Sequence, residues 1–487
     1  MATTGSDAVI QFPVLVEGHY NRQTGNKSMN LRVAFNLFTD ALMALAALVF
    51  AAGVRFGRFD LPENWEAEQG VAAGTIFVGV TLFSSYLMEV HSLPKESRKR
   101  EIFAACLQSG CAAFFLLSVL YYLDPSLMLG RGVLFFALGF FIIFQFAWYA
   151  ISGIEARTVP FAQRVLILGT GDLACQLGGL ITSQGGSFTL AGYLECGEGM
   201  PAATVHQSET FNSQVMPVEG DLLQTARNHR VSIIVVALAE RRGVLPLQEM
   251  MRCKLNGIEI VDAPTFYEIV QGKLMLEEMT PSWIIFSSGF RRNALINVYK
   301  RCVDILLSVV GLLLAAPLFP LIALAIKLDS PGPLFFKQVR VGTGEKPFLL
   351  YKFRSMCQDA ERNGAVWAAK NDARVTRVGK FLRNSRIDEI PQLYNVLKGE
   401  MSFIGPRPER PEFVENLKKD IYYYSKRHTI KPGLTGWAQV RYPYGATVED
   451  AKEKLRYDLY YIKNLSFLLD TQIIFETVKV VLFGRGR

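Results

Sequence analysis

Four long apolar runs follow a polar segment at the start of the chain. Residues 1–30 are rich in Gly, Asn, Ser and Thr and lack the pattern of a signal peptide, so we expect a flexible tail there. The apolar runs are Val33–Val54, Val71–Val90, Ile102–Leu123 and Val133–Ile154. Each has close to the ~20 residues that a helix needs to cross a bilayer. Residues 31–156 are therefore predicted to form a bundle of four transmembrane helices.

Basic residues near these runs predict how the bundle is oriented. They lie before the first run, between the second and third, and after the fourth: Arg22, Lys27, Arg32, Lys95, Arg98, Lys99, Arg100, Arg157 and Arg164. The connection between the first and second runs is mainly acidic. Because cytoplasmic segments carry the excess of Lys and Arg, both ends of the bundle are expected in the cytoplasm.

The pattern changes near residue 160, where short apolar runs alternate with helical segments. RVLILGTGDLA predicts a buried strand, a glycine turn and the start of a helix, and VSIIVVAL and GIEIVDAP predict further strands. Residues 160–270 should form a doubly wound, Rossmann-like α/β domain. The spacing of Gly169, Gly171, Ala174 and Glu195 is compatible with dinucleotide binding. Any tight strand-to-helix junction needs such a turn as well, so the ligand of this domain stays open.

A fifth apolar segment lies in the second half of the chain. It runs from Ile305 to Ile326 without a charge and follows a predicted linker, residues 271–299. Pro317 and Pro320 lie near its middle, where each removes a helix hydrogen bond, so we expect a break at Ala316-Pro317. A full fifth crossing would place the two soluble parts on opposite sides of the membrane. We therefore predict a re-entrant helix over residues 303–328, with both ends on one side. A kinked helix that spans the membrane stays open as the alternative, and part of the support for re-entry is the family resemblance described below.

Composition agrees with a membrane protein that handles anions. Half of the 487 residues are hydrophobic, 20% are charged and the net charge is +8. Such a charge suits lipid headgroups or phosphorylated substrates. The sequence has no resemblance to a nucleic-acid-binding module, so we expect no nucleic-acid partner. The seven cysteines form no CxxC pair and no zinc-ligand spacing, which is compatible with a reducing compartment.

Candidate chemistry is concentrated in RNSRIDEIPQLYNVLKGEMSFIGPRP, residues 383–408. An adjacent acid pair, Asp388-Glu389, follows Arg383, and Arg407 stands between Pro406 and Pro408 in a rigid turn. Two carboxylates among cations suggest a site that binds a phosphorylated anion and keeps one carboxylate ionised. The ordinary alternative is a solvated helix face with surface ion pairs.

Four motifs in this order resemble those of a known family. They are a proline-broken helix running into SPGPLFFKQVRVG, then YKFRSM, then RNSRIDEIPQLYNVLKGEMSFIGPRPE, then KPGLTGWAQV. The C-terminal part resembles the monotopic polyprenyl-phosphate phosphoglycosyltransferases, bacterial sugar transferases that start polysaccharide assembly. With the four apolar runs and the α/β domain, nearly the whole chain is similar to the large branch of that family. The one departure is Ala316-Pro317, where some relatives have Ser-Pro.

This resemblance implies a fold, a reaction and a site. Residues 300–487 would be a mainly α catalytic domain on the cytoplasmic face of the bacterial inner membrane. It would transfer a hexose-1-phosphate from a UDP-sugar to undecaprenyl phosphate, release UMP and so start exopolysaccharide or O-antigen synthesis. Asp388 would be the nucleophile and a Mg²⁺ ligand, and Glu389 its acidic partner. The residues implied in substrate binding are Lys352, Arg354, Arg383, Pro406, Arg407 and Pro408. Membrane lipid is a further partner, and a homodimer stays open.

Two other functions remain as alternatives. A membrane-anchored NAD-dependent nucleotide-sugar epimerase or dehydratase would use the Gly169–Ala174 turn and a Tyr-x-x-x-Lys pair. Tyr394–Lys398 and Tyr422–Lys426 match that string but lie far from the glycines in sequence. The third reading is a non-enzymatic assembly or regulatory protein whose α/β domain senses a nucleotide.

Overall fold

The computed structural model describes two compact units, Arg22–Val270 and, after it, Gln271–Arg487. The described residues are 22–57, 68–88, 90, 99–151, 162–184, 188–195, 215–216, 221–238, 245–287, 289–290, 294–358, 374–442, 445 and 447–483. Residues 1–21 of the expected tail and the loop cations Lys95, Arg98 and Arg157 lie outside them.

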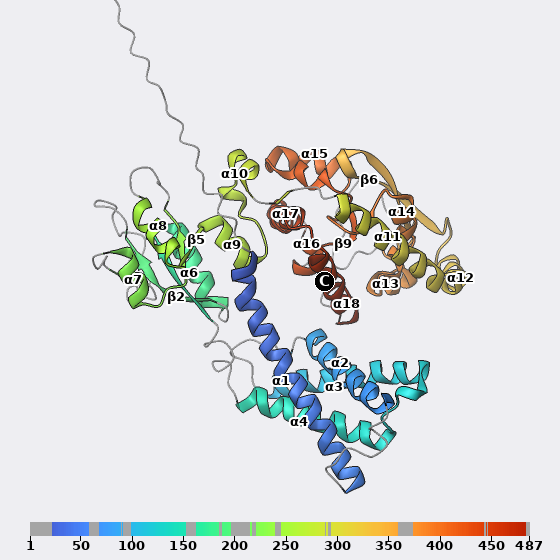
Figure 1. Cartoon of the computed structure of the whole chain (residues 1–487). Coiled ribbons are helices and arrows are strands. Elements are labelled where there is room, and N and C mark those ends of the chain that lie inside the picture. Colours follow the sequence, from blue (N-terminus) through green and yellow to red (C-terminus); the bar gives the residue numbers. More distant parts are fainter. Residues whose placement is uncertain are drawn as a thin grey trace, which may run out of the picture. The chain divides into compact units, whose positions relative to one another are not determined.

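Four long helices form the N-terminal part of the first unit (blue to teal in Figure 1). They are α1 Arg22–Phe56, α2 Glu68–Leu87, α3 Lys99–Leu123 and α4 Arg131–Ile151, with a short 3₁₀ turn, η3 Pro125–Leu127, before α4. All four are long and apolar enough to cross a membrane, as is the segment Ala294–Asp329. Helix α1 begins at Arg22, so it includes the last residues of the segment expected to be a tail.

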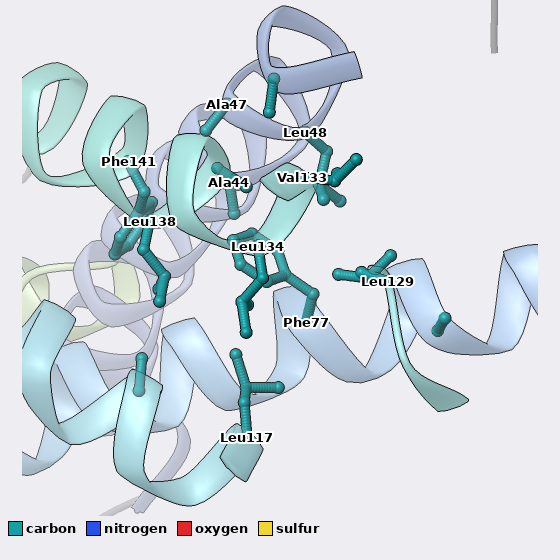
Figure 2. Close-up of a cluster of buried hydrophobic side chains, with 14 of the residues drawn as sticks. Ala44, Ala47, Leu48, Phe77, Leu117, Leu129, Val133, Leu134, Leu138 and Phe141 are labelled. Carbon is teal, nitrogen blue, oxygen red and sulfur yellow. The ribbon is translucent and has the colours of Figure 1, made fainter. Parts of the chain in front are cut away.

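Small side chains let the helices of this bundle approach closely. Figure 2 shows Ala44 and Ala47 of α1 in one buried cluster with Leu138 of α4, and α1 packs mainly against α4. Small residues at such contacts favour helix association in lipid, where no hydrophobic effect drives it. A buried hydrogen-bond network adds to the packing: Gln145 Nε2 donates to Asp40 Oδ2 at 3.1 Å and to Ser85 Oγ at 2.8 Å. This network joins α1, α2 and α4.

A five-stranded sheet forms the rest of the first unit (Figure 1). All its neighbouring strands are parallel, in the order β3-β2-β1-β4-β5. The strands are β1 Gln163–Leu168, β2 Phe188–Leu194, β3 Val215–Met216, β4 Ile233–Val236 and β5 Glu259–Asp262. The helices are α6 Asp172–Gln184, α7 Leu222–Asn228, α8 Leu247–Leu255 and α9 Ala263–Gln271. This order is that of a Rossmann-like sheet, and the predicted parallel sheet with helices is confirmed.

The second unit begins with short helices and then a long apolar pair. After η6 Leu276–Glu278 and α10 Pro281–Phe286 comes α11 Ala294–Ala315, followed by η7 Ala316–Leu318 and α12 Phe319–Asp329. The expected linker 271–299 thus contains α10 and the first turns of α11. The 3₁₀ turn η7 contains Pro317, which has no N–H to donate to the preceding turn.

Helices and two small sheets make up the remainder of the second unit (yellow to red in Figure 1). Strands β6 Phe335–Val341 and β7 Pro347–Phe353 form an antiparallel hairpin around η8 Thr343–Glu345, and β8 Ser402–Ile404 pairs in parallel with β9 Gly433–Thr435. The helical elements are α13 Arg377–Asn384, η9 Ile387–Glu389, α14 Gln392–Lys398, α15 Pro411–Asp420, η10 Tyr424–Thr429, α16 Trp437–Arg441, α17 Val448–Lys463 and α18 Phe467–Phe483.

Both ends of the α11–α12 pair are bonded to this part of the unit. Near the start, Arg301 donates to Val396 O at 2.7 Å and to Leu397 O at 2.6 Å, which satisfies carbonyls at the end of α14. At the other end, Asp329 Oδ2 accepts from Val378 N at 2.9 Å, at the start of α13. Arg301 lies within α11, and its guanidinium donates to protein carbonyls of α14.

The glycine turn after β1 allows a test of the α/β domain. Gly169 has φ +118°, and a Cβ there would lie 2.7 Å from Ala237 O, whereas a Cβ on Gly171 meets no atom within 4 Å. Gly169→Ala should therefore destabilise the domain by about 1–3 kcal/mol, because both the backbone conformation and the contact become unfavourable. Gly171→Ala is the matched control and should leave the thermal unfolding midpoint of the domain nearly unchanged. Equal midpoints for the two variants would contradict this account of the turn.

Candidate active site

A short turn carries the acid pair at a point where the backbone is unusual. Helix α13 ends at Asn384, and Arg386 then adopts a left-handed conformation, with φ +57°. Asp388 and Glu389 follow on the 3₁₀ turn η9 and are only 7% and 8% exposed. Two buried carboxylates on a turn exclude the alternative of a solvated helix face. A non-glycine residue at positive φ costs energy, and strained residues of this kind cluster at functional sites.

Lys352 and Arg407 hold the Glu389 carboxylate, and Arg386 Nη1 lies farther away, 3.9 Å from Glu389 Oε2. Lys352 Nζ and Arg407 Nη2 each lie 2.8 Å from Glu389 Oε1. Burial alone would raise the pKa of Glu389, but the charges of Lys352 and Arg407 outweigh it and hold that pKa well below its usual range. The Glu389 charge in turn raises the pKa of Arg407. Glu389 is therefore ionised at neutral pH, with its charge balanced.

Asp388 differs from its neighbour in both contacts and pKa. Among the residues that the structure describes, none makes a hydrogen bond to the Asp388 carboxylate. Burial raises its pKa; the charge of Lys352 opposes this rise and the charge of Glu389 adds to it. The pair thus consists of one carboxylate engaged by cations and one that is open and less acidic. An open carboxylate beside cations can act as a nucleophile toward phosphorus or as a metal ligand.

Lys352 reaches the acid pair because Asn395 holds its strand. The Asn395 side chain is fully buried in α14, where Nδ2 donates to Leu349 O at 2.7 Å and Oδ1 accepts from Tyr351 N at 3.2 Å. These bonds attach strand β7 to the helix that follows Glu389. The sequence reasoning missed Asn395, because a single Asn in a helical pattern gives no sign of its partner strand.

The other two basic residues implied in substrate binding are Arg354 of YKFRSM and Arg383 of RNSRIDEIPQ, and they have different surroundings. The buried Arg354 guanidinium donates to Ser330 O at 2.6 Å and to Pro331 O at 2.7 Å, so it holds the turn after α12. Arg383 donates through Nε to Ser355 Oγ at 2.9 Å. The charge of Arg383 opposes the rise that burial causes in the Asp388 pKa, whereas the contacts of Arg354 are those of a structural residue.

The loop that carries Arg407 is packed against the KPGLTG motif. Gly405 N donates to Thr435 O at 2.9 Å, and Gly433 N donates to Pro406 O at 2.9 Å. A Cβ on Gly433 would lie 2.1 Å from Gly405 N, so the two backbones approach more closely than any side chain would permit. This contact explains why two glycine-containing motifs far apart in sequence belong to one site. Pro406 and Pro408 contribute the shape of the loop.

The site offers one open carboxylate, that of Asp388, as a ligand for a divalent cation. The part of the chain that the structure describes contains no group of three or more His, Cys, Asp or Glu side chains that could hold a metal. Mg²⁺, however, is commonly held by one or two carboxylates together with substrate phosphates and water. The open Asp388 carboxylate meets that requirement, and Glu389, neutralised by Lys352 and Arg407, does not.

Comparisons with known proteins assign these residues to a family. Residues 295–484 match the family model described as "Bacterial sugar transferase". The exopolysaccharide production protein PSS of Rhizobium leguminosarum bv. phaseoli is 45% identical over 187 residues, which are 37% of this chain and 94% of that protein.

Two longer relatives extend the similarity toward the first unit. The UDP-N-acetylgalactosamine-undecaprenyl-phosphate N-acetylgalactosaminephosphotransferase of Aeromonas hydrophila is 43% identical over 237 residues, 49% of this chain. The UDP-glucose:undecaprenyl-phosphate glucose-1-phosphate transferase of Klebsiella pneumoniae is 38% identical over 263 residues, 53% of this chain. The chain spans only 55% and 56% of the lengths of these two relatives.

The ion pairs of Glu389 predict a pH-dependent loss of stability on removal of one cation. Lys352→Met should destabilise the second unit by about 1–3 kcal/mol at pH 7, because it leaves a buried carboxylate with one cation fewer. The folded-state pKa of Glu389 lies below its unfolded value of about 4.3, so its pairs stabilise the fold above that pH and lose this contribution as the pH falls. The difference between wild type and variant should shrink below pH ~4.

Denaturant unfolding at pH 7 and at about pH 3 measures this difference. Lys337→Met is the matched control, since Lys337 is exposed on the neighbouring strand β6. A stability difference for Lys352→Met that does not depend on pH would contradict the assigned ion pairs.

Proposed function

This chain belongs to the bacterial sugar transferase family, and we propose that it transfers a hexose-1-phosphate from a UDP-sugar to undecaprenyl phosphate. The products are UMP and the lipid-linked sugar that starts exopolysaccharide or O-antigen repeat-unit synthesis. The observation that carries the proposal is the open Asp388 carboxylate beside a Glu389 whose charge is already balanced. Relatives' names include glucose and N-acetylgalactosamine, so the choice of sugar is decided by assay.

A covalent route avoids bringing two phosphorylated substrates together. An Asp388 carboxylate oxygen attacks the sugar-bearing phosphorus, the bond from that phosphorus to the bridging oxygen breaks, and UMP leaves with the electron pair. A phosphate oxygen of undecaprenyl phosphate then attacks the same phosphorus and releases the Asp388 carboxylate. Each anion uses the site in turn, which is the advantage of nucleophilic catalysis here.

The surrounding residues prepare Asp388 for this role. Lys352 and Arg407 neutralise Glu389, so that the two adjacent carboxylates can both be ionised at neutral pH. Arg383 and the remaining donors of Arg407 are suited to phosphate oxygens, because a planar guanidinium matches them. Mg²⁺ would be held by Asp388 and the donor diphosphate, and when bound it supplies charge stabilisation at the leaving phosphate.

The apolar helices support a membrane location for this reaction. Four helices in the first unit would span the bacterial inner membrane, and the α11–α12 pair would enter it from the cytoplasmic side and return. In the apolar 18-residue window of Ala294–Asp329 only 17% of the residues are buried, and the exposed side chains of the segment include Leu313, Leu321 and Leu324. Because Arg301 and Asp329, at opposite ends, both bond to residues 378–397, re-entry needs no separation of these contacts.

The NAD-dependent alternative has no support from the relatives or from the site. Both Tyr-x-x-x-Lys strings lie in the second unit, whereas the Gly169 turn belongs to the first. The parallel sheet with its glycine turn remains compatible with a bound nucleotide of regulatory function.

The nucleophile assignment predicts the outcome of one conservative substitution. Asp388→Asn should lower UMP release by at least about 1,000-fold, since the amide cannot form the covalent intermediate. Purified protein, undecaprenyl phosphate and a panel of UDP-sugars provide the assay, with the unfolding midpoint measured in parallel. Asp420→Asn, an exposed change on α15, is the control and should keep full activity. Turnover near the wild-type rate in Asp388→Asn would exclude Asp388 as the nucleophile.

Re-entry predicts that the two flanks of the helix pair face the same compartment. Single cysteines placed at Ser282, before α11, and at Pro333, after α12, are both at exposed positions. In a cysteine-free background, an impermeant maleimide should label both only from the cytoplasmic side. Labelling of the two positions from opposite sides would establish a full crossing.

A further inference from the structure

A buried ion pair behind the active site has the geometry to position its arginine. We infer that Arg427 and Asp458 are positioning residues for Arg407, and that through Arg407 they fix the Glu389 carboxylate beside the nucleophile. This inference rests on the proposed function in so far as it concerns turnover.

The loop Pro406-Arg407-Pro408 depends on outside donors for its position. Prolines have no N–H and a restricted φ, so this loop cannot form regular hydrogen bonds of its own. Its three successive carbonyls accept from three separate elements. The donors are Gly433 N to Pro406 O at 2.9 Å, Arg427 Nη2 to Arg407 O at 3.0 Å, and Arg340 Nη1 to Pro408 O at 2.9 Å. The central bond is the one made at Arg407 itself.

Arg427 makes that bond from a rigid and buried position. Its side chain is 5% exposed, its Nη2 lies 2.8 Å from Asp458 Oδ2, and Nη1 donates to Tyr424 Oη at 2.6 Å. Asp458 is 2% exposed in the middle of α17. The guanidinium donates to Arg407 O and Tyr424 Oη through two different nitrogens while its charge pairs with Asp458, whereas a lysine ammonium is a single point. Truncating either member would leave a buried charge without its partner.

The contacts continue from this pair to the reacting carboxylate. Arg407 is held by its carbonyl to Arg427 and by its side chain to Glu389, at 2.8 Å. Glu389 is the residue next to Asp388. A shift of the Arg407 backbone would therefore move a cation that balances Glu389. Misplacement by about 1 Å in such a site can cost about 100-fold in rate.

Arg427→Lys removes the planar guanidinium with its several donors and keeps a positive charge opposite Asp458. We expect kcat to fall about 10- to 100-fold with a change in KM for the UDP-sugar of less than about threefold, because Arg427 is not a substrate ligand. Tyr424→Phe, which removes one acceptor of Arg427, is the milder second variant and should show the same pattern at smaller size. An increase in KM with no change in kcat in both variants would overturn the inference.

A double-mutant cycle distinguishes positioning from general stability. If Arg427 acts through Arg407, then Arg427→Lys should cost little further rate in an Arg407→Gln background. Additive losses in rate would mean that Arg427 acts elsewhere. Glu453→Gln is the matched control on the same helix α17, where Glu453 pairs with Lys273 and Arg456. Its effect on rate should be small, and it should add to that of Arg407→Gln.

Hydrogen–deuterium exchange gives a result that does not need activity. In Arg427→Lys the peptide covering residues 402–413 should exchange faster than in the wild type, and in Glu453→Gln it should not. Unchanged exchange in Arg427→Lys would overturn the inference even if the enzyme works as proposed. Conversely, a wild type that releases no UMP with any UDP-sugar would refute the proposed function, while faster exchange in Arg427→Lys would still support positioning of the loop.

Discussion

The site depends on one ion-pair arrangement, in which Lys352 and Arg407 share the buried Glu389 carboxylate. Taking a carboxylate out of water is costly, so such a group persists only where cations and geometry are well matched. Here the cations come from strand β7 and from the loop after β8, and the carboxylate from the turn η9. Three segments must therefore meet within hydrogen-bond distance. Because these cations balance the charge of Glu389, the adjacent Asp388 carboxylate stays open without a second uncompensated negative charge beside it.

Backbone contacts carry much of the work of bringing these segments together. Gly405 and Gly433 let two loops touch directly, Asn395 attaches β7 to α14, and Arg354 holds the turn after α12. In each case the bond made is to main-chain atoms, so it fixes the path of the chain and leaves other side chains free to act. The motif residues thus fall into two groups: those that fix the path of the backbone, and those whose side chains surround the two carboxylates.

Hydrogen bonds at both ends of the α11–α12 pair would also connect the site to a membrane. The helix pair α11–α12 exposes leucines along its length, while Arg301 and Asp329 at its two ends bond to the segments on either side of the acid pair. The depth at which this pair lies in a bilayer would therefore set the height of Asp388 above the lipid tails. A long isoprenoid could stay in the membrane with its phosphate at the carboxylate, which is the arrangement the proposed reaction requires.

Periodicity and residue type in the sequence alone determined the apolar helices, the parallel α/β sheet, the glycine turn at Gly169 and the acid pair. These are local properties: run length, proline and glycine positions and the spacing of like residues decide them. The sequence could not determine which cation pairs with which carboxylate, because Lys352, Glu389 and Arg407 are joined only when β7, η9 and the loop after β8 meet. It also grouped Arg354 with the substrate ligands, whereas tertiary packing directs its guanidinium to the carbonyls of Ser330 and Pro331. Asn395, Arg427 and Asp458 gave no sequence signal, since a buried polar residue acquires its role only from the partner that folding brings to it.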